Sequence, residues 1–190
     1  MLRALVDDHG RWDRGTRHFP FVCLALSVLC CVVAYNLSGE KWPDNEVNDL
    51  DIWIPGYDPH KGAWGDSYSA WNAAGTAVHF NEVASMEQAE VIAHSYDWGD
   101  DGRDGLCITY TYEGIIYFAY AHVNTHYTPS YPYNKVRSVA THELGHSVGL
   151  DEMGTGFAVV MNYASNWRYD EWGVYTPQSD DIDGLYDLYY

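Results

Sequence analysis

The stretch from His142 to Glu152 constrains this chain more than any other feature of its sequence. It reads H-E-L-G-H-S-V-G-L-D-E, and its start matches the zinc-binding pattern H-E-x-x-H. Residues four apart lie on one face of a helix, so His142 and His146 can direct two imidazoles at one ion. Glu143 follows the first histidine, and its carboxylate can reach a water on that ion without binding the metal. The pattern therefore predicts a metal-binding helix with a general base beside the ligands.

The residues after the second histidine predict a turn and a third ligand. Gly149 favours the end of a helix, because glycine tolerates positive φ angles. A chain that turns there can bring a third ligand back to the metal, and Glu152 is the position that would do so. Carboxylates bind zinc beside two histidines in known peptidase sites. Asp151, one residue earlier, is a rival ligand.

The whole stretch resembles the signature of the metzincin zinc peptidases, H-E-x-x-H-x-x-G-x-x-H followed by a Met-turn. It departs from that signature at Glu152, where the family normally has histidine. Residues 159–163 read V-V-M-N-Y and are similar to the Met-turn, so the resemblance implies that Met161 lies beneath the ligands. By resemblance to astacin- and serralysin-like members, Tyr163 stabilises the transition state. Packing of this tyrosine under the cleft is the alternative.

The resemblance extends to compact, matrixin-type catalytic domains and covers roughly residues 46–190. Residues 71–80, 123–125 and 179–185 carry it outside the motif. It implies a metzincin-like α+β fold, with a twisted, mostly antiparallel or mixed sheet, an active-site helix and a C-terminal helix. It also implies that an edge strand pairs with extended substrate, and we expect residues 115–123 to form that strand. Residues 164–169 should line the specificity pocket.

Hydrophobic periodicity predicts the same order of elements without the resemblance. Alternating apolar residues indicate strands, and apolar residues at helical spacing indicate helices. The order of strand, helix, several strands and two further helices is an α+β arrangement. Strands are expected at 50–55, 77–83, 89–96, 106–112 and 115–123, with a hairpin turn at Glu113-Gly114, and helices at 64–74, 135–148 and 180–189.

The N-terminus predicts export. Residues 19–35 form an apolar run preceded by arginines, which is typical of a secretory signal peptide. Cleavage after Ala34 would leave residues 35–190 as the catalytic domain. The alternative is that residues 1–34 remain as an uncleaved membrane anchor with the catalytic domain outside. Three of the four cysteines lie in this run, so a cleaved chain keeps only Cys107, which we expect to be buried in a strand.

Charge and length narrow the remaining possibilities. The chain of 190 residues suggests one domain, and its net charge of −17 argues against nucleic-acid binding. Residues 97–105 form a loop rich in aspartate and glycine, which makes calcium a possible second metal. His122 and His126 lack the helical spacing of the motif, and we interpret them as structural or groove-lining residues, whereas we interpret His94 as a packing or surface residue.

The sequence therefore predicts a secreted, monomeric zinc endopeptidase that acts on protein or peptide substrates. Zinc with three protein ligands keeps a position for water, and Glu143 is expected to take a proton as that water attacks the peptide carbonyl. The alternative, which the change at Glu152 makes possible, is an extracellular metal-binding module with little or no catalysis.

Overall fold

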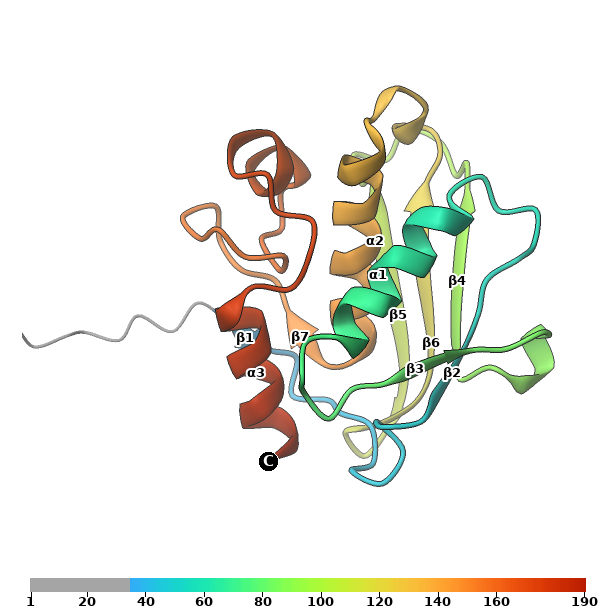
Figure 1. Cartoon of the computed structure of the whole chain (residues 1–190), viewed down its shortest axis with the longest axis vertical. Helices are drawn as coiled ribbons and strands as arrows, with labels where there is room; N and C mark the ends of the chain where they lie inside the picture. Colours follow the sequence, from blue (N-terminus) through green and yellow to red (C-terminus); the bar gives the residue numbers. More distant parts are fainter. Residues whose placement is uncertain (1–34) are drawn as a thin grey trace, which may run out of the picture. The chain divides into compact units, whose positions relative to one another are not determined.

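Five strands form one mixed sheet in the computed structural model, in which residues 35–190 are described (Figure 1). The predicted signal peptide or anchor, residues 1–34, lies outside the described residues. The strand order across the sheet is β3-β2-β4-β6-β5. The strands are β2 (Leu50–Trp53), β3 (Phe80–Glu82), β4 (Val91–Tyr96), β5 (Gly105–Tyr112) and β6 (Ile115–Asn124).

The sheet combines parallel and antiparallel pairing. β2 runs parallel to β3 and to β4, and β4 runs parallel to β6. Only β5 and β6 are antiparallel, and Glu113 and Gly114 join them with φ angles of 52° and 81°. Positive φ at both residues is the geometry of a tight hairpin turn, which confirms the predicted connection. The sequence predicted a mostly antiparallel or a mixed sheet, and the observed sheet is mixed.

The expected substrate-pairing edge strand is corrected by the sheet order. β6, which corresponds to the predicted strand 115–123, lies between β4 and β5, so β5 is the edge strand. The burial of β6 gives the physical reason, since Ala119, Ala121 and Val123 are fully buried beneath the helices. A strand with hydrogen-bonded neighbours on both sides has no free backbone edge to offer a peptide.

Two helices cover one face of the sheet. In Figure 1, α1 (Lys61–Asn72) and α2 (Tyr133–Ser147) both lie in front of the strands. The predicted helix at 64–74 is thus present but begins at Lys61, and the predicted metal-binding helix begins at Tyr133. Residues on the inner side of α2, such as Val139 and Leu144, are fully buried.

The C-terminal part lies beside the metal-binding helix. A two-stranded antiparallel sheet pairs β1 (Asn36–Leu37) with β7 (Leu150–Asp151), and α3 (Ser179–Tyr189) lies next to both strands (Figure 1). The predicted C-terminal helix is therefore confirmed. Short helical turns complete the chain at Met86–Gln88 and Thr128–Ser130, and a π-helix spans Asn166–Glu171.

Two buried tryptophans fix α2 within the core, and a third links α1 to β4. The indole N–H of Trp42 donates to the carbonyl of Ser147 at 2.7 Å, and that of Trp71 donates to the carbonyl of Thr141 at 3.0 Å. Trp64 donates to Ser95 Oγ at 2.9 Å. Buried indoles that satisfy their N–H groups add specific geometry to apolar burial. Within residues 35–190, no helix has the length and apolar character that crossing a bilayer requires.

Candidate metal centre

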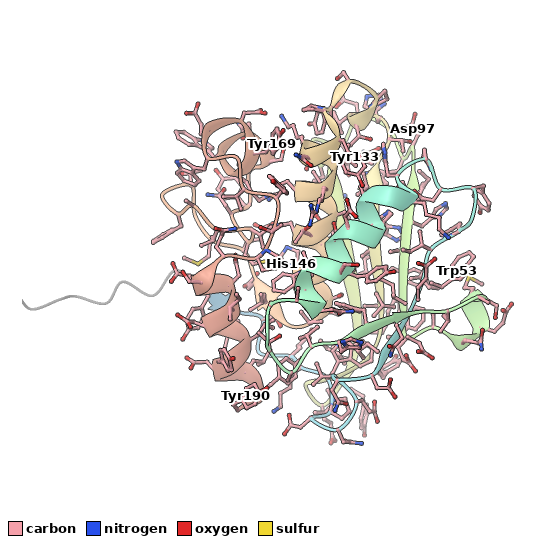
Figure 2. All side chains as sticks on the ribbon, in the orientation of Figure 1. Trp53, Asp97, Tyr133, His146, Tyr169 and Tyr190 are labelled. Atoms are coloured by element: carbon pink, nitrogen blue, oxygen red, sulfur yellow. The ribbon has the colours of Figure 1, made fainter. Side chains whose placement is uncertain are left out.

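The two motif histidines face each other on α2. His142 Nε2 and His146 Nε2 lie 3.0 Å apart, near the C-terminal end of the helix, where Figure 2 labels His146. The other nitrogen of each ring is held by a backbone carbonyl. His142 Nδ1 lies 2.9 Å from the oxygen of Val160, and His146 Nδ1 lies 2.9 Å from the oxygen of Leu150.

This geometry fits a metal ion between the rings. A ring nitrogen that approaches a carbonyl must carry the proton, so each Nδ1 is a donor and each Nε2 has a lone pair. Two lone pairs that face each other at 3.0 Å repel unless a cation lies between them. Tetrahedral zinc with Zn–N bonds of about 2.0–2.1 Å would separate its two nitrogen ligands by about 3.3 Å. Carbonyl partners at the second nitrogen are also typical of metal-binding histidines.

Burial favours the neutral form of both imidazoles. His142 is 3% exposed, and desolvation holds its pKa well below the usual value, with Arg168 and His146 adding to the shift. Desolvation also lowers the pKa of His146, against the opposing effect of its bond to the Leu150 carbonyl. Neutral imidazole is the form that binds metal.

Glu152 completes a group of three potential ligands. Ligand atoms of His142, His146 and Glu152 all lie within 4.8 Å of one another. Asp151, the rival, is not in this group. Its Oδ1 accepts the backbone N–H of Glu152 at 2.7 Å, and the residue is exposed on β7. The arrangement therefore favours Glu152 as the third ligand.

Two features of the chain direct Glu152 toward the histidines. Gly149 has a φ of 95°, and a Cβ there would lie 2.4 Å from the carbonyl oxygen of Glu40, so only glycine fits this turn. After the turn, β7 pairs with β1, and the Asn36 side-chain amide donates to the Glu152 carbonyl at 2.7 Å. Strand β1 thus holds the backbone of Glu152, the candidate third ligand.

Glu143 lies beside this group in a space that a glycine leaves open. It is 4% exposed, and burial raises the pKa of its carboxyl well above the usual value. A Cβ on Gly105 would lie 2.1 Å from Glu143 Oε1, so the first residue of β5 must lack a side chain. A carboxyl with a raised pKa is suited to accept and return a proton near neutral pH.

Met161 lies beneath the helix, as the Met-turn resemblance implies. It is fully buried, and a Cβ on Gly145 would lie 2.3 Å from its sulfur. The carboxylate of Asp181, in the first turn of α3, accepts the N–H groups of Val160 and Met161 at 2.9 and 3.1 Å. Helix α3 therefore fixes the position of Val160, and the carbonyl of Val160 contacts the ring of His142.

A cavity of about 460 Å³ opens over the candidate centre. His142, Glu143, His146 and Glu152 line it together with the start of β5, and Tyr163 lies at its rim with 55% of its surface exposed. Tyr163 is thus accessible from the cavity rather than packed beneath it. Cys107 also lines the cavity and is only partly buried, which corrects the expectation of a closed core position. Burial of the thiol raises its pKa.

The predicted specificity segment is divided between two cavities. Residues 164–166 line a second cavity of about 320 Å³, which shares Asp104 and Tyr163 with the first. Arg168 lines the first cavity and is 1% exposed. Arg168 lies within the predicted specificity segment, but the sequence did not distinguish it from its neighbours there. The signal was present, because it is the only lysine or arginine after residue 137.

The other sequence candidates lie elsewhere. His122 stacks on Tyr120, with ring centroids 5.6 Å apart, and neither His122 nor His126 lines a described cavity. In the acidic loop, Asp101 pairs with Arg103 and Asp100 accepts the hydroxyl of Tyr127. Because these carboxylates bind protein donors, calcium remains an expectation from sequence alone.

Comparisons with known proteins agree with this fold. No protein-family model matches the chain, and no curated protein matches it either. Two solved structures of myroilysin superimpose with TM-scores of 0.54 and 0.50, both at 11% identity and over 78% of this chain, covering 82% and 85% of theirs. High choriolytic enzyme 1, a hatching enzyme zinc-protease from Oryzias latipes (medaka fish), gives 0.49 at 12% identity over 79% of this chain and 93% of that one. This last similarity is too weak to add to the comparison.

The predicted fold class, a metzincin-like α+β domain, is thus confirmed by the observed elements and by the superposition on myroilysin. At this identity the similarity establishes the fold alone, and the matrixin-like subtype stays a prediction.

Proposed function

We propose that this protein is a zinc-dependent endopeptidase. One observation carries the proposal: two histidine nitrogens and a carboxylate converge within 4.8 Å, beside a buried glutamate that faces the same cavity. A purely structural zinc site uses four protein ligands and needs no base. The presence of Glu143 therefore argues for the enzyme over the alternative of a metal-binding module.

His142, His146 and Glu152 would hold the zinc. Bound there, the metal would supply a Lewis acid that polarises a peptide carbonyl and makes water more acidic. The Nδ1 bonds to Val160 and Leu150 would keep both imidazoles oriented. An anionic third ligand offsets part of the metal charge, so water should be somewhat less acidic than at a three-histidine site.

Glu143 would move the proton. Its carboxylate accepts one proton from the attacking water and later delivers it to the leaving amine, which balances the hydrolysis of one peptide bond. Tyr163, which lines the cavity, would donate a hydrogen bond from its hydroxyl to the developing oxyanion. Substrate would lie extended along the free edge of β5, which begins beside Glu143.

We further propose that the catalytic domain acts outside the cell, because an apolar run with a basic flank precedes it. Protein or peptide chains are the expected substrates.

The test joins metal content to hydrolysis. The purified protein should contain about one zinc per chain and cleave casein or gelatin. A chelator should abolish cleavage, and added zinc should restore it. Zinc bound tightly without any cleavage would favour the binding module, and cleavage that persists after complete metal removal would contradict the proposal.

A further inference from the structure

Arg168 is a buried cation without an ion pair. Its side chain is 1% exposed, and none of the ion pairs found within residues 35–190 includes it. Nε donates to Ser138 Oγ at 2.9 Å, and Nη1 donates to the carbonyl of Asn162. No hydrogen bond from Nη2 is found within residues 35–190, and Nη2 is not one of the fully buried atoms that lack a partner there, so this end of the guanidinium keeps some exposure to the cavity. Buried charges are rarely left unpaired, because removing them from water is costly.

Two of the carboxylates that act on Arg168 accept hydrogen bonds from other donors. Asp104 accepts the hydroxyl groups of Ser165 and Tyr131 on the same oxygen, Oδ2. Asp181 accepts three backbone N–H groups, from Val160, Met161 and Gln178. Both carboxylates, together with Glu143 and Glu152, act on Arg168 without a hydrogen bond and counteract the lowering of its pKa by burial. None of them supplies the paired contact that a guanidinium fork can make.

The unpaired guanidinium faces the candidate centre. Arg168 lines the same cavity as His142, Glu143 and Tyr163. Its two hydrogen-bond partners fix the position of the guanidinium. Ser138 lies one helical turn before His142, and Asn162 follows Met161 directly. The cation is therefore held at the wall of the cavity, beside the first metal ligand.

We propose that Arg168 is a specificity-determining residue that binds the carboxylate of an aspartate or glutamate next to the scissile bond. Arginine is the residue best suited to pair with a carboxylate in a desolvated site, because its planar fork matches both oxygens. This inference rests on the proposed peptidase function and adds the substrate class. A free C-terminal carboxylate would offer the same chemistry, and the test separates it from a side chain.

The first experiment uses the unaltered protein. Cleavage sites in a mixed peptide library are mapped by mass spectrometry, and the preferred sequence is then synthesised with Glu or with Gln beside the scissile bond. Each peptide is made with a free and with an amidated C-terminus. A charge-assisted hydrogen bond should favour Glu over Gln by about 10- to 100-fold in kcat/KM, with either terminus.

A Glu-to-Gln ratio within about twofold would overturn the proposal, and so would a preference that disappears on amidation. Failure of the proposed function looks different, because then no peptide is cut or no zinc is bound.

Variants assign the preference to the guanidinium. Arg168→Met should bring the Glu-to-Gln ratio to about one while zinc content stays at one per chain, and Arg168→Lys should retain part of the preference. Arg103→Met is the matched control, since it removes a second cation that lines the cavity but is already paired with Asp101. Its ratio should equal that of the unaltered protein, and loss of preference in this variant alone would overturn the assignment. If Arg168→Met does not fold, the peptide comparison on the unaltered protein still decides.

Discussion

At the residue scale, the candidate centre depends on three glycines as much as on its proposed ligands. Gly105 leaves room for the carboxylate of Glu143, and Gly145 leaves room for the sulfur of Met161. Gly149 provides the turn that returns Glu152 to the histidines. Each glycine stands where a Cβ would lie less than 3 Å from a neighbouring atom. Single substitutions can therefore separate the roles of ligand, base and turn.

The first prediction concerns the base. Glu143→Gln keeps the shape of the side chain but removes its ability to accept a proton. We expect hydrolysis to fall by about 10²–10⁴-fold, while zinc content and the unfolding midpoint change little. Kinetics with a peptide substrate and metal analysis of the same sample measure both. Activity equal to that of the unaltered protein would remove Glu143 from the mechanism.

The second prediction concerns the third ligand. Glu152→Ala should lower zinc affinity, because one of three protein ligands is lost, whereas Asp151→Ala should largely keep it. Glu152→His should preserve binding, since it supplies the ligand usual in the metzincin signature. Competition with a zinc-binding dye measures all three. The opposite order of Glu152→Ala and Asp151→Ala would assign the metal to Asp151.

The third prediction concerns the turn. Gly149→Ala places a Cβ at a φ of 95° and 2.4 Å from a backbone oxygen. The φ angle alone costs about 1–3 kcal/mol, and the contact adds to it. Denaturant unfolding should show this loss together with weaker zinc binding. Gly154→Ala is the control, because a Cβ there has no atom within 4 Å. Equal stability of the two variants would mean that the turn relaxes freely.

At the element scale, α3 and β1 support a site to which neither contributes a proposed ligand. Asp181 of α3 holds Val160 and Met161 through their backbone N–H groups, and Asn36 of β1 holds the carbonyl of Glu152. Helix α2 supplies the two histidines, but the segments before and after it set their partners. Loss of either support should therefore disturb the metal site from a distance.

The fourth prediction uses the pH dependence of Asp181. Burial raises its pKa from 3.8 to about 6, despite the opposing backbone hydrogen bonds. The folded state then binds this proton more tightly than the unfolded state. The stability that this residue contributes is fully present below pH 3.8 and is lost as pH rises to about 6. In Asp181→Asn this contribution is absent.

The raised pKa of Asp181 is tested by measuring the free energy of unfolding of the unaltered protein and of Asp181→Asn from pH 4 to 8. The difference, unaltered protein minus Asp181→Asn, should fall up to about pH 6 and then stay constant. A constant difference over the whole range would show that the pKa is not raised.

At the scale of the whole molecule, residues 35–190 form one α+β domain in which the C-terminal segment lies beside the helix-covered sheet (Figure 1). The Tyr35 hydroxyl donates to the carboxylate of Asp187, and its ring lies close to Gly184 in α3. The start of the predicted catalytic domain is therefore attached to its last helix.

The fifth prediction concerns this start. If the signal-peptide interpretation is right, the exported protein begins near Tyr35. N-terminal sequencing and intact mass of the protein from the medium measure it. A full-length product in the membrane fraction would support the anchor instead.

The sequence by itself determined the local part of the site. The i, i+4 spacing of His142 and His146 is a helical property, so two candidate ligands and the adjacent Glu143 could be predicted without a fold. The turn at Gly149 and the hairpin turn at Glu113-Gly114 were predictable for the same reason, since positive φ angles have strong residue preferences.

Only the tertiary structure decided what depends on contacts between distant segments. The edge position of β5 follows from the pairing of β4 with β6, and residues 115–123 do not encode that pairing locally. Arg168 became a candidate because it is buried beside His142 without an ion pair, and burial is a property of the assembled chain. Local backbone preferences depend on residues that are neighbours in sequence, whereas strand order and desolvation depend on which distant residues pack together.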